Sequence, residues 1–238
     1  MIVVAWTDIK EIVINQFRFL LFQPLQMDLP RLKAHYLGYG ILIAWIVGIG
    51  RYWDNPRAEG WQYLGLGSLS YILILALMLW LILLPLRPQQ WTYFNVLIFV
   101  GMTALPGLLY AIPVELFTPV QTAAQINMWF LIVVALWRVG LLMRFLRCVA
   151  KLSIGSVIVA TFLPISTILV VLTLLNLEHS AVTLMGGIAE NARSVNDRAY
   201  EITTLLGVVS MMAFPFLFFA YVVIAYQERK DQSRSKSL

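Results

Sequence analysis

Arg138 is a candidate functional residue, because it is a charged side chain inside the apolar stretch ALWRVGLLMRFL at positions 135–146. A guanidinium carries five N–H donors and stays charged, so it binds phosphate, carboxylate or carbonyl oxygens. An ionisable residue inside a membrane segment is a hypothesis of function by default, because its burial is costly. Arg138 therefore needs acceptor groups from the rest of the chain, from lipid or from a ligand.

Three prolines inside apolar stretches supply candidate acceptors. A proline lacks the N–H and leaves the carbonyl four residues earlier without its helical partner, so Pro106, Pro164 and Pro215 predict three kinked spans with freed carbonyls. The freed carbonyls are those of Met102, Ala160 and Met211. With the hydroxyl residues nearby, the sequence predicts a mid-membrane polar site made of Arg138, Thr103, Pro106, Thr161, Pro164, Ser166, Thr167, Ser210 and Pro215.

Two interpretations of this site stay open. In one, Arg138 donates to carbonyls and only locks the helix bundle. In the other, it lines a wet cavity and meets an anion such as a lipid phosphate. Glu115 is a candidate outer partner for Arg138 if the proline-bent segment 113–119 dips back into the membrane.

Catalytic and metal sites are not expected. His35 and His179 fall near opposite membrane faces, and Cys148 is the one cysteine, so neither a histidine pair nor a cysteine metal site is available. Ser68, in the stretch GSLS, has no histidine inside a span to act as its base, so it is interpreted as a packing residue. We therefore expect no catalytic residue, no metal and no cofactor, and a protein that is not an enzyme.

The composition indicates what must position these residues. Of 238 residues, 61% are hydrophobic and 12% charged, whereas soluble domains are about a quarter charged. Several apolar runs reach the roughly 20 residues that span a hydrocarbon core. The expected fold is an all-α polytopic membrane helical bundle with six transmembrane helices. The spans are expected at 35–51, 61–86, 91–112, 127–147, 153–177 and 202–226.

The distribution of basic residues predicts the orientation. With six spans, both termini share a side with the 87–90 and 148–152 connections, and that side holds twelve of the seventeen Lys and Arg residues. Since basic residues concentrate in cytoplasmic loops, both termini are expected in the cytoplasm. The expected location is the bacterial inner (plasma) membrane, with a eukaryotic endomembrane as the alternative. The net charge is +5, but the basic residues lie at the ends of the spans, so nucleic acid is not an expected partner.

The chain divides into three expected regions. Residues 1–34 form an amphipathic segment interpreted as an interfacial helix on the cytoplasmic leaflet, with Asn15 on its wet face; a packed cytoplasmic helix is the alternative. Residues 35–226 form the transmembrane domain, and 227–238 a basic cytoplasmic tail. Gly40, Ala44 and Gly48 predict a close packing seam, either within the chain or between two copies. Three basic residues are interpreted as headgroup anchors: Arg144, Arg147 and Lys151.

Three stretches are similar to the YIP-domain family: TALPGLLYAIP, ALWRVGLL and FLLFQPLQMDLP. The likeness covers about residues 15–175. It implies a polytopic membrane protein, usually of five spans, whose eukaryotic members act in membrane traffic and contact small GTPases, and whose bacterial members lack an assigned activity. This chain departs from the family in its sixth span and its short hydrophilic N-terminal part, and these differences argue against a GTPase partner.

The sequence therefore leaves two alternative functions open. The first is a non-enzymatic scaffold or assembly partner, resembling the YIP-domain family, that binds another membrane protein subunit. The alternative is a small transporter or lipid-handling component, such as a six-span substrate-binding subunit, that uses a mid-membrane cavity around Arg138. The expected partners are the lipid bilayer, a second membrane subunit, and an anionic lipid or small anion.

Overall fold

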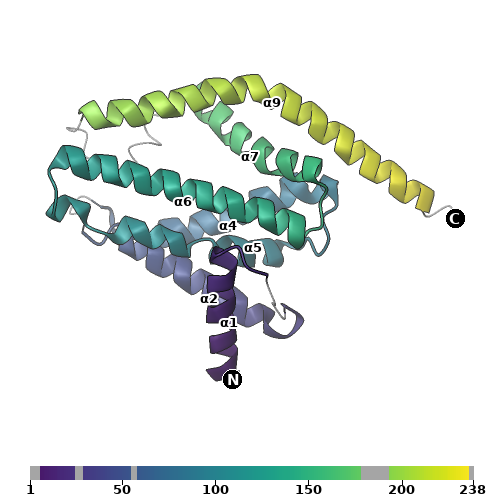
Figure 1. The fold of residues 1–238 in the computed structure, drawn as a ribbon, viewed down its shortest axis with the longest axis horizontal. Helices are drawn as coiled ribbons and strands as arrows, with labels where there is room; N and C mark the ends of the chain where they lie inside the picture. Colours follow the sequence, from purple (N-terminus) through teal and green to yellow (C-terminus); the bar gives the residue numbers. More distant parts are fainter. Residues whose placement is uncertain (1–5, 25–28, 55–57, 178–192, 236–238) are drawn as a thin grey trace. The chain divides into compact units, whose positions relative to one another are not determined.

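The computed structural model describes residues 6–24, 29–54, 58–177 and 193–235, and every regular element in these ranges is helical (Figure 1). This confirms the all-α prediction. The described chain forms two compact units: unit 1 comprises Met1–Trp80 and Thr92–Ala111, and unit 2 comprises Leu81–Trp91 and Ile112–Leu238.

Five helices are long and apolar enough to cross a membrane, and a sixth crossing is made if one bent pair counts as a single span. The five are α2 (Leu29–Gly50), α4 (Leu66–Leu83), α6 (Val120–Cys148), α7 (Ile154–Leu174) and α9 (Arg193–Ser235). The bent pair is α5 (Tyr93–Met102) with the 3₁₀ helix η2 (Leu105–Ala111). The helices are therefore compatible with a polytopic membrane protein, with five or six candidate spans.

In unit 1, α2 and α5 run parallel and touch at their backbones. Lys33 Nζ lies 5.8 Å from the centre of the Phe94 ring, and further along both helices a Cβ added at Gly101 would lie 2.9 Å from the Gly40 Cα. Trp53 then donates its indole N–H to the Ala111 carbonyl at 3.0 Å. The small residues of the first span thus pack within one chain, as the first of the two alternatives predicts.

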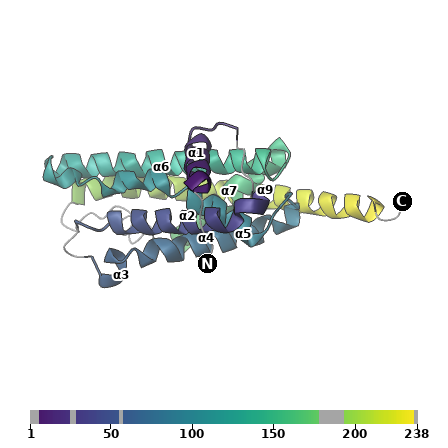
Figure 2. The ribbon, with the colours of Figure 1, turned by 90° about the horizontal axis from the view of Figure 1, so that it is seen from below.

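The second expected span begins later than predicted. The short helix α3 (Gly60–Tyr63) is separate from α4, and Gly65 between them has a φ of +67°. A side chain at Gly65 would meet the Trp45 carbonyl, while the Trp45 indole donates to the Leu64 carbonyl at 2.7 Å. Only glycine adopts this left-handed conformation without strain, so the chain turns here before α4 starts. Figure 2 shows α3 as a short helix at the lower left, before α4.

In unit 2, α7 packs along α9, and Thr173 near the end of α7 lies against Gly207 early in α9. Tyr221, later in α9, donates its hydroxyl to the Ile82 carbonyl at 2.7 Å. The C-terminal part of α9 then extends beyond α7 (Figure 1). The helix has 43 residues and exceeds the predicted span 202–226 at both ends.

Two short connections of unit 2 are joined by a backbone hydrogen bond. Between α4 and α5, η1 (Leu84–Leu86) leads into residues 87–90, and Gln89 N–H donates to the Ala150 carbonyl at 3.0 Å. The 87–90 and 148–152 connections, which the six-span prediction puts on one side of the membrane, therefore meet. Which side they occupy stays a prediction.

Candidate functional site

The polar residues predicted for one mid-membrane layer are divided between the two units. Thr103 and Pro106 belong to unit 1, and the remaining seven belong to unit 2. Unit 1 contains the better-connected polar group, because it combines a helix break with buried hydrogen bonds.

The helix break lies where the sequence predicts it. α5 ends at Met102, η2 begins at Leu105, and the two axes differ by 41°. Both Thr103 and Pro106 are buried, and the Thr103 hydroxyl donates to the Val100 carbonyl at 2.7 Å. Pro106 cannot donate to the Met102 carbonyl, so the α-helical ladder stops here.

The carbonyl freed by Pro106 has a donor from the N-terminal helix α1 (Trp6–Leu20). Gln16 Nε2 donates to the Met102 carbonyl oxygen at 2.8 Å, across 86 residues of sequence. Gln16 is fully buried. The freed acceptor was predicted with Arg138 as the expected donor, whereas the structure places Gln16 there.

Two further side-chain contacts bury the same face of α1. Asn15 Nδ2 donates to the Tyr36 hydroxyl at 2.8 Å, and Tyr36 is fully buried. The Phe19 and Phe99 rings meet edge to face with centres 5.8 Å apart. Asn15 therefore does not lie on a wet face as predicted, because its amide is bonded inside unit 1. The side of α1 that stays exposed is mainly apolar: Trp6, Ile9, Ile14 and Phe17.

We name Asn15, Gln16, Tyr36, Met102 and Thr103 the α1 clasp. Its chemistry is hydrogen bonding, because it contains amides, hydroxyls and a carbonyl. Gln16 Oε1 has no hydrogen-bond partner among the described residues. Within the described ranges, no group of three or more His, Cys, Asp or Glu residues could hold a metal ion. The clasp is therefore suited to fixing the bend of α5 and η2.

The predicted site residues of unit 2 lie along α7 and α9. Thr161, Pro164 and Ser166 are buried in α7, and the Thr167 hydroxyl donates to the Leu163 carbonyl at 2.7 Å. Ser210 is buried in α9, whereas Pro215 is exposed. Both prolines lie inside helices that continue past them, so these two spans remain single helices. In the part of unit 2 that the structure describes, three buried hydroxyl oxygens have no hydrogen-bond partner: those of Thr161, Thr173 and Thr204.

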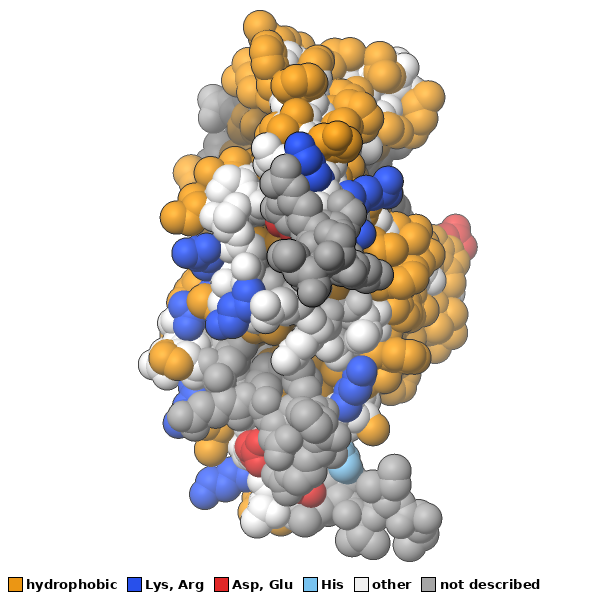
Figure 3. Space-filling view, turned by 90° about the vertical axis from the view of Figure 1, so that its right-hand side faces the viewer, with side chains coloured by type: hydrophobic (Ala, Val, Ile, Leu, Met, Phe, Trp, Pro, Cys, Tyr) orange, Lys and Arg blue, Asp and Glu red, His pale blue; other side chains and the backbone are white. Residues whose placement is uncertain are grey.

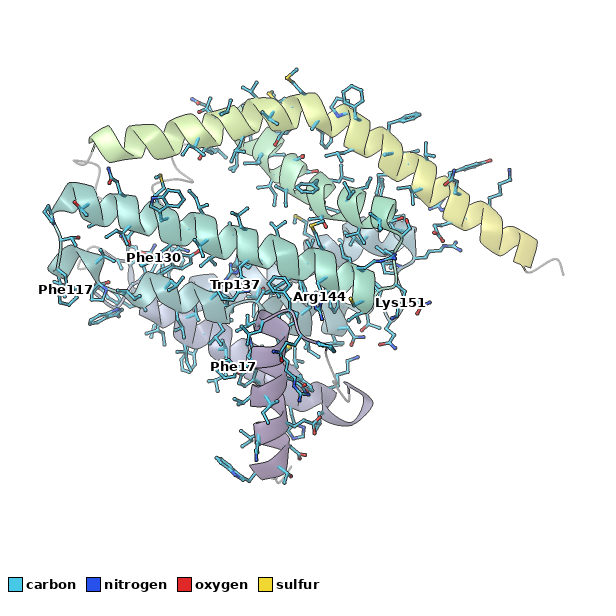
Figure 4. The ribbon with its side chains drawn as sticks, viewed as in Figure 1. Phe17, Phe117, Phe130, Trp137, Arg144 and Lys151 are labelled. Atoms are coloured by element: carbon cyan, nitrogen blue, oxygen red, sulfur yellow. The ribbon has the colours of Figure 1, made fainter. Side chains whose placement is uncertain are left out.

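Arg138 lies on α6 next to Trp137, and its side chain is half-buried (Figure 4). Its predicted direction, toward the third, fifth or sixth span, stays a prediction. Glu115, the predicted outer partner, lies in the 3₁₀ turn η3 (Val114–Leu116), and its side chain is outside the described part. The Thr118 hydroxyl closes this turn on the Val114 carbonyl at 2.9 Å.

Of the three predicted headgroup anchors, Arg144 and Arg147 lie in the last turns of α6 and Lys151 in the turn after it; Figure 4 labels Arg144 and Lys151. Arg144 is half-buried, while Arg147 and Lys151 are exposed. Arg147 Nη1 donates to the Leu152 carbonyl at 2.8 Å, which fixes the guanidinium beside the turn.

No family model, curated protein or solved structure matches this chain. The resemblance to the YIP-domain family therefore stays a prediction.

Proposed function

We propose that this chain is a non-enzymatic integral membrane protein that serves as an assembly partner in a membrane complex. The observation that carries the proposal is the exposure of the last candidate span. Ile202–Lys230 is the longest span at 29 residues, and 6% of its apolar window is buried, against 39% for Ile154–Leu174. Most of α9 is therefore available to lipid or to another subunit.

Length and side-chain type favour a protein partner for α9. Twenty-nine helical residues measure about 43 Å, whereas the hydrocarbon core is about 30 Å thick. A helix with this mismatch tilts or associates with other helices. Its exposed surface carries Phe216, Phe219 and Tyr226, and Phe214 and Phe218 stack with ring centres 5.9 Å apart. Large aromatic side chains contribute strongly to interfaces at a small entropy cost.

We also propose six spans, with both termini in the cytoplasm of a bacterial cell. The contacts of Lys33 with Phe94 and of Trp53 with Ala111 support the count, because the bent pair then runs beside α2 for most of its length. The bond between Gln89 and Ala150 supports an alternating topology, since it joins two connections assigned to one side. The twelve basic residues on that side support the orientation.

Photo-crosslinking in the native membrane tests the assembly role. A photoreactive amino acid replaces Phe216 or Phe219, which are 78% and 72% exposed. Leu136 on α6, at 67%, serves as the matched control. We expect both α9 positions to give a protein adduct of the same mass. The same adduct should be recovered in a second experiment in which the captured subunit, instead of this chain, carries the affinity tag. Adducts with lipid alone, or equal adducts from Leu136, would contradict the proposal, and an adduct of twice 27.1 kDa would identify a second copy as the partner.

A small transporter or lipid-handling component is the second candidate. The buried hydroxyls of Thr161, Thr173 and Thr204 favour it, because unpaired polar groups on α7 and α9 are suited to lining a polar ligand path. Mass spectrometry of small molecules that co-purify in mild detergent tests this role. A ligand retained by the wild type and lost from a Thr161→Val variant would support it.

A further inference from the structure

The two joined connections of unit 2 form a rigid, basic surface. The Gln89–Ala150 bond holds them together, and their apolar neighbours Leu86, Ala150 and Leu152 are buried. The rings of Trp91, just after the first connection, and Phe145, near the end of α6, have centres 6.2 Å apart. The backbone positions from which side chains project at this surface are therefore held in place.

Three of those projecting side chains are cations: Arg87, Arg147 and Lys151. All three are exposed. Arg87 and Lys151 have φ values of 51° and 56°, so each stands at a sharp left-handed turn of the backbone. The bond from Arg147 to the Leu152 carbonyl uses Nη1 and leaves other guanidinium donors.

The charge of this surface is not compensated nearby in the sequence. Residues 81–91 and 116–177 contain no Asp or Glu. The two connections and the helices that flank them thus supply cations without a carboxylate of their own. Figure 3, which views the side of the molecule at the right of Figure 1, shows many Lys and Arg side chains among the hydrophobic ones.

We propose that Arg87, Arg147 and Lys151 form one binding site for a phosphate group, and that its source is the headgroup of an anionic lipid. Arginine presents a planar fork that matches phosphate oxygens, and lysine adds a compact charge. The site lies between the end of the span Gln125–Cys148 and the start of the span Ile154–Leu174, which is the level of lipid headgroups. The site is independent of the proposed assembly through α9. It also adds Arg87, from a connection about 60 residues earlier in the sequence, to Arg147 and Lys151, two of the three predicted headgroup anchors.

Native mass spectrometry of the full chain in detergent tests this site. Wild type and the single variants Arg87→Gln, Arg147→Gln and Lys151→Gln are titrated with phosphatidylglycerol and with phosphatidylcholine. Arg229→Gln is the matched control, because Arg229 is also exposed but lies near the end of α9. Thermal melting checks that each variant is folded, and Arg147→Lys replaces Arg147→Gln if the lost bond to Leu152 unfolds the turn.

The wild type should retain phosphatidylglycerol over phosphatidylcholine, and each of the three variants should weaken that retention about fivefold, the equivalent of about 1 kcal/mol per basic residue near an anionic surface. Arg229→Gln should change it less than twofold. A parallel titration with inorganic pyrophosphate distinguishes the sources: binding that needs the same three residues in the absence of lipid would assign the site to a soluble phosphate. Equal losses in Arg229→Gln would overturn the site, and so would an unchanged Arg87→Gln variant.

Discussion

Units 1 and 2 both place proline inside apolar helices, but the described structure breaks a helix only at Pro106 in unit 1. There the α-helix gives way to a 3₁₀ turn, and the freed carbonyl of Met102 receives a side-chain donor. In unit 2, α7 continues through Pro164 and α9 through Pro215. Local sequence explains part of the difference, since Gly107 follows Pro106 and removes a side chain at the bend, whereas bulky apolar residues follow Pro164 and Pro215. The comparison teaches that a helix break at a proline is stable where a side chain from another segment donates a hydrogen bond to the freed carbonyl.

The largest expected effect is from removing that donor. Gln16→Leu should lower the free energy of unfolding by about 2–3 kcal/mol, because it leaves the buried Met102 carbonyl without its partner in a low-dielectric interior. Unfolding in mixed detergent micelles measures the change. Gln23→Leu, at an exposed glutamine just after α1, is the control and should be nearly neutral. Equal stability of the two variants would show that the α1 clasp does not hold the break.

A smaller loss is expected from filling the seam beside the break. Gly101→Ala should destabilise unit 1 by about 2 kcal/mol, because its new Cβ would lie 2.9 Å from the Gly40 backbone, which cannot move aside cheaply. Gly207→Ala in unit 2 should cost less, since the group in the way is the Thr173 hydroxyl, a side chain that can rotate. Melting temperatures of both variants check the order, with Gly155→Ala, where a Cβ meets nothing within 4 Å, as the reference.

A double-mutant cycle sharpens the link between the proline and its cap. Pro106→Ala restores an N–H that can donate to the Met102 carbonyl. On that background, Gln16→Leu should cost about 1 kcal/mol less than it does in the wild type. Additive effects of the two changes would mean that Gln16 stabilises α1 docking without compensating for the proline.

The smallest effect is expected in unit 2. Pro215→Ala should raise stability by about 1 kcal/mol or less, a fraction of the roughly 3 kcal/mol that proline costs inside an isolated helix, because α9 already accommodates Pro215 without a break. The free energies of unfolding of Pro215→Ala and Pro106→Ala, measured in mixed micelles, test the difference between the two units. A large gain at Pro215 would reveal strain that the continuous helix does not show.

The sequence predicts the features that depend on local chemistry. Apolar runs and basic residues indicate the spans, Gly40 predicts the close seam, and Pro106 predicts a freed carbonyl. It does not predict the partner of that carbonyl, because Gln16 is 86 positions away and sits in a helix whose amphipathic pattern favours a different buried face. Helices α7 and α9 continue as single helices past Pro164 and Pro215, and the kinks expected at these two prolines stay predictions. The φ of Gly65 likewise separates α3 from α4 within one continuous apolar run.

The bond between Gln16 and Met102 also constrains the order of events during synthesis. Helix α1 leaves the ribosome well before α5, so the Gln16 amide cannot donate to the Met102 carbonyl until residue 102 has been made. Until then, Gln16 remains stable only in contact with water or with the insertion machinery, because an unpaired amide in hydrocarbon is costly. Helix α1 is therefore made early but docks late, and its docking marks the completion of unit 1.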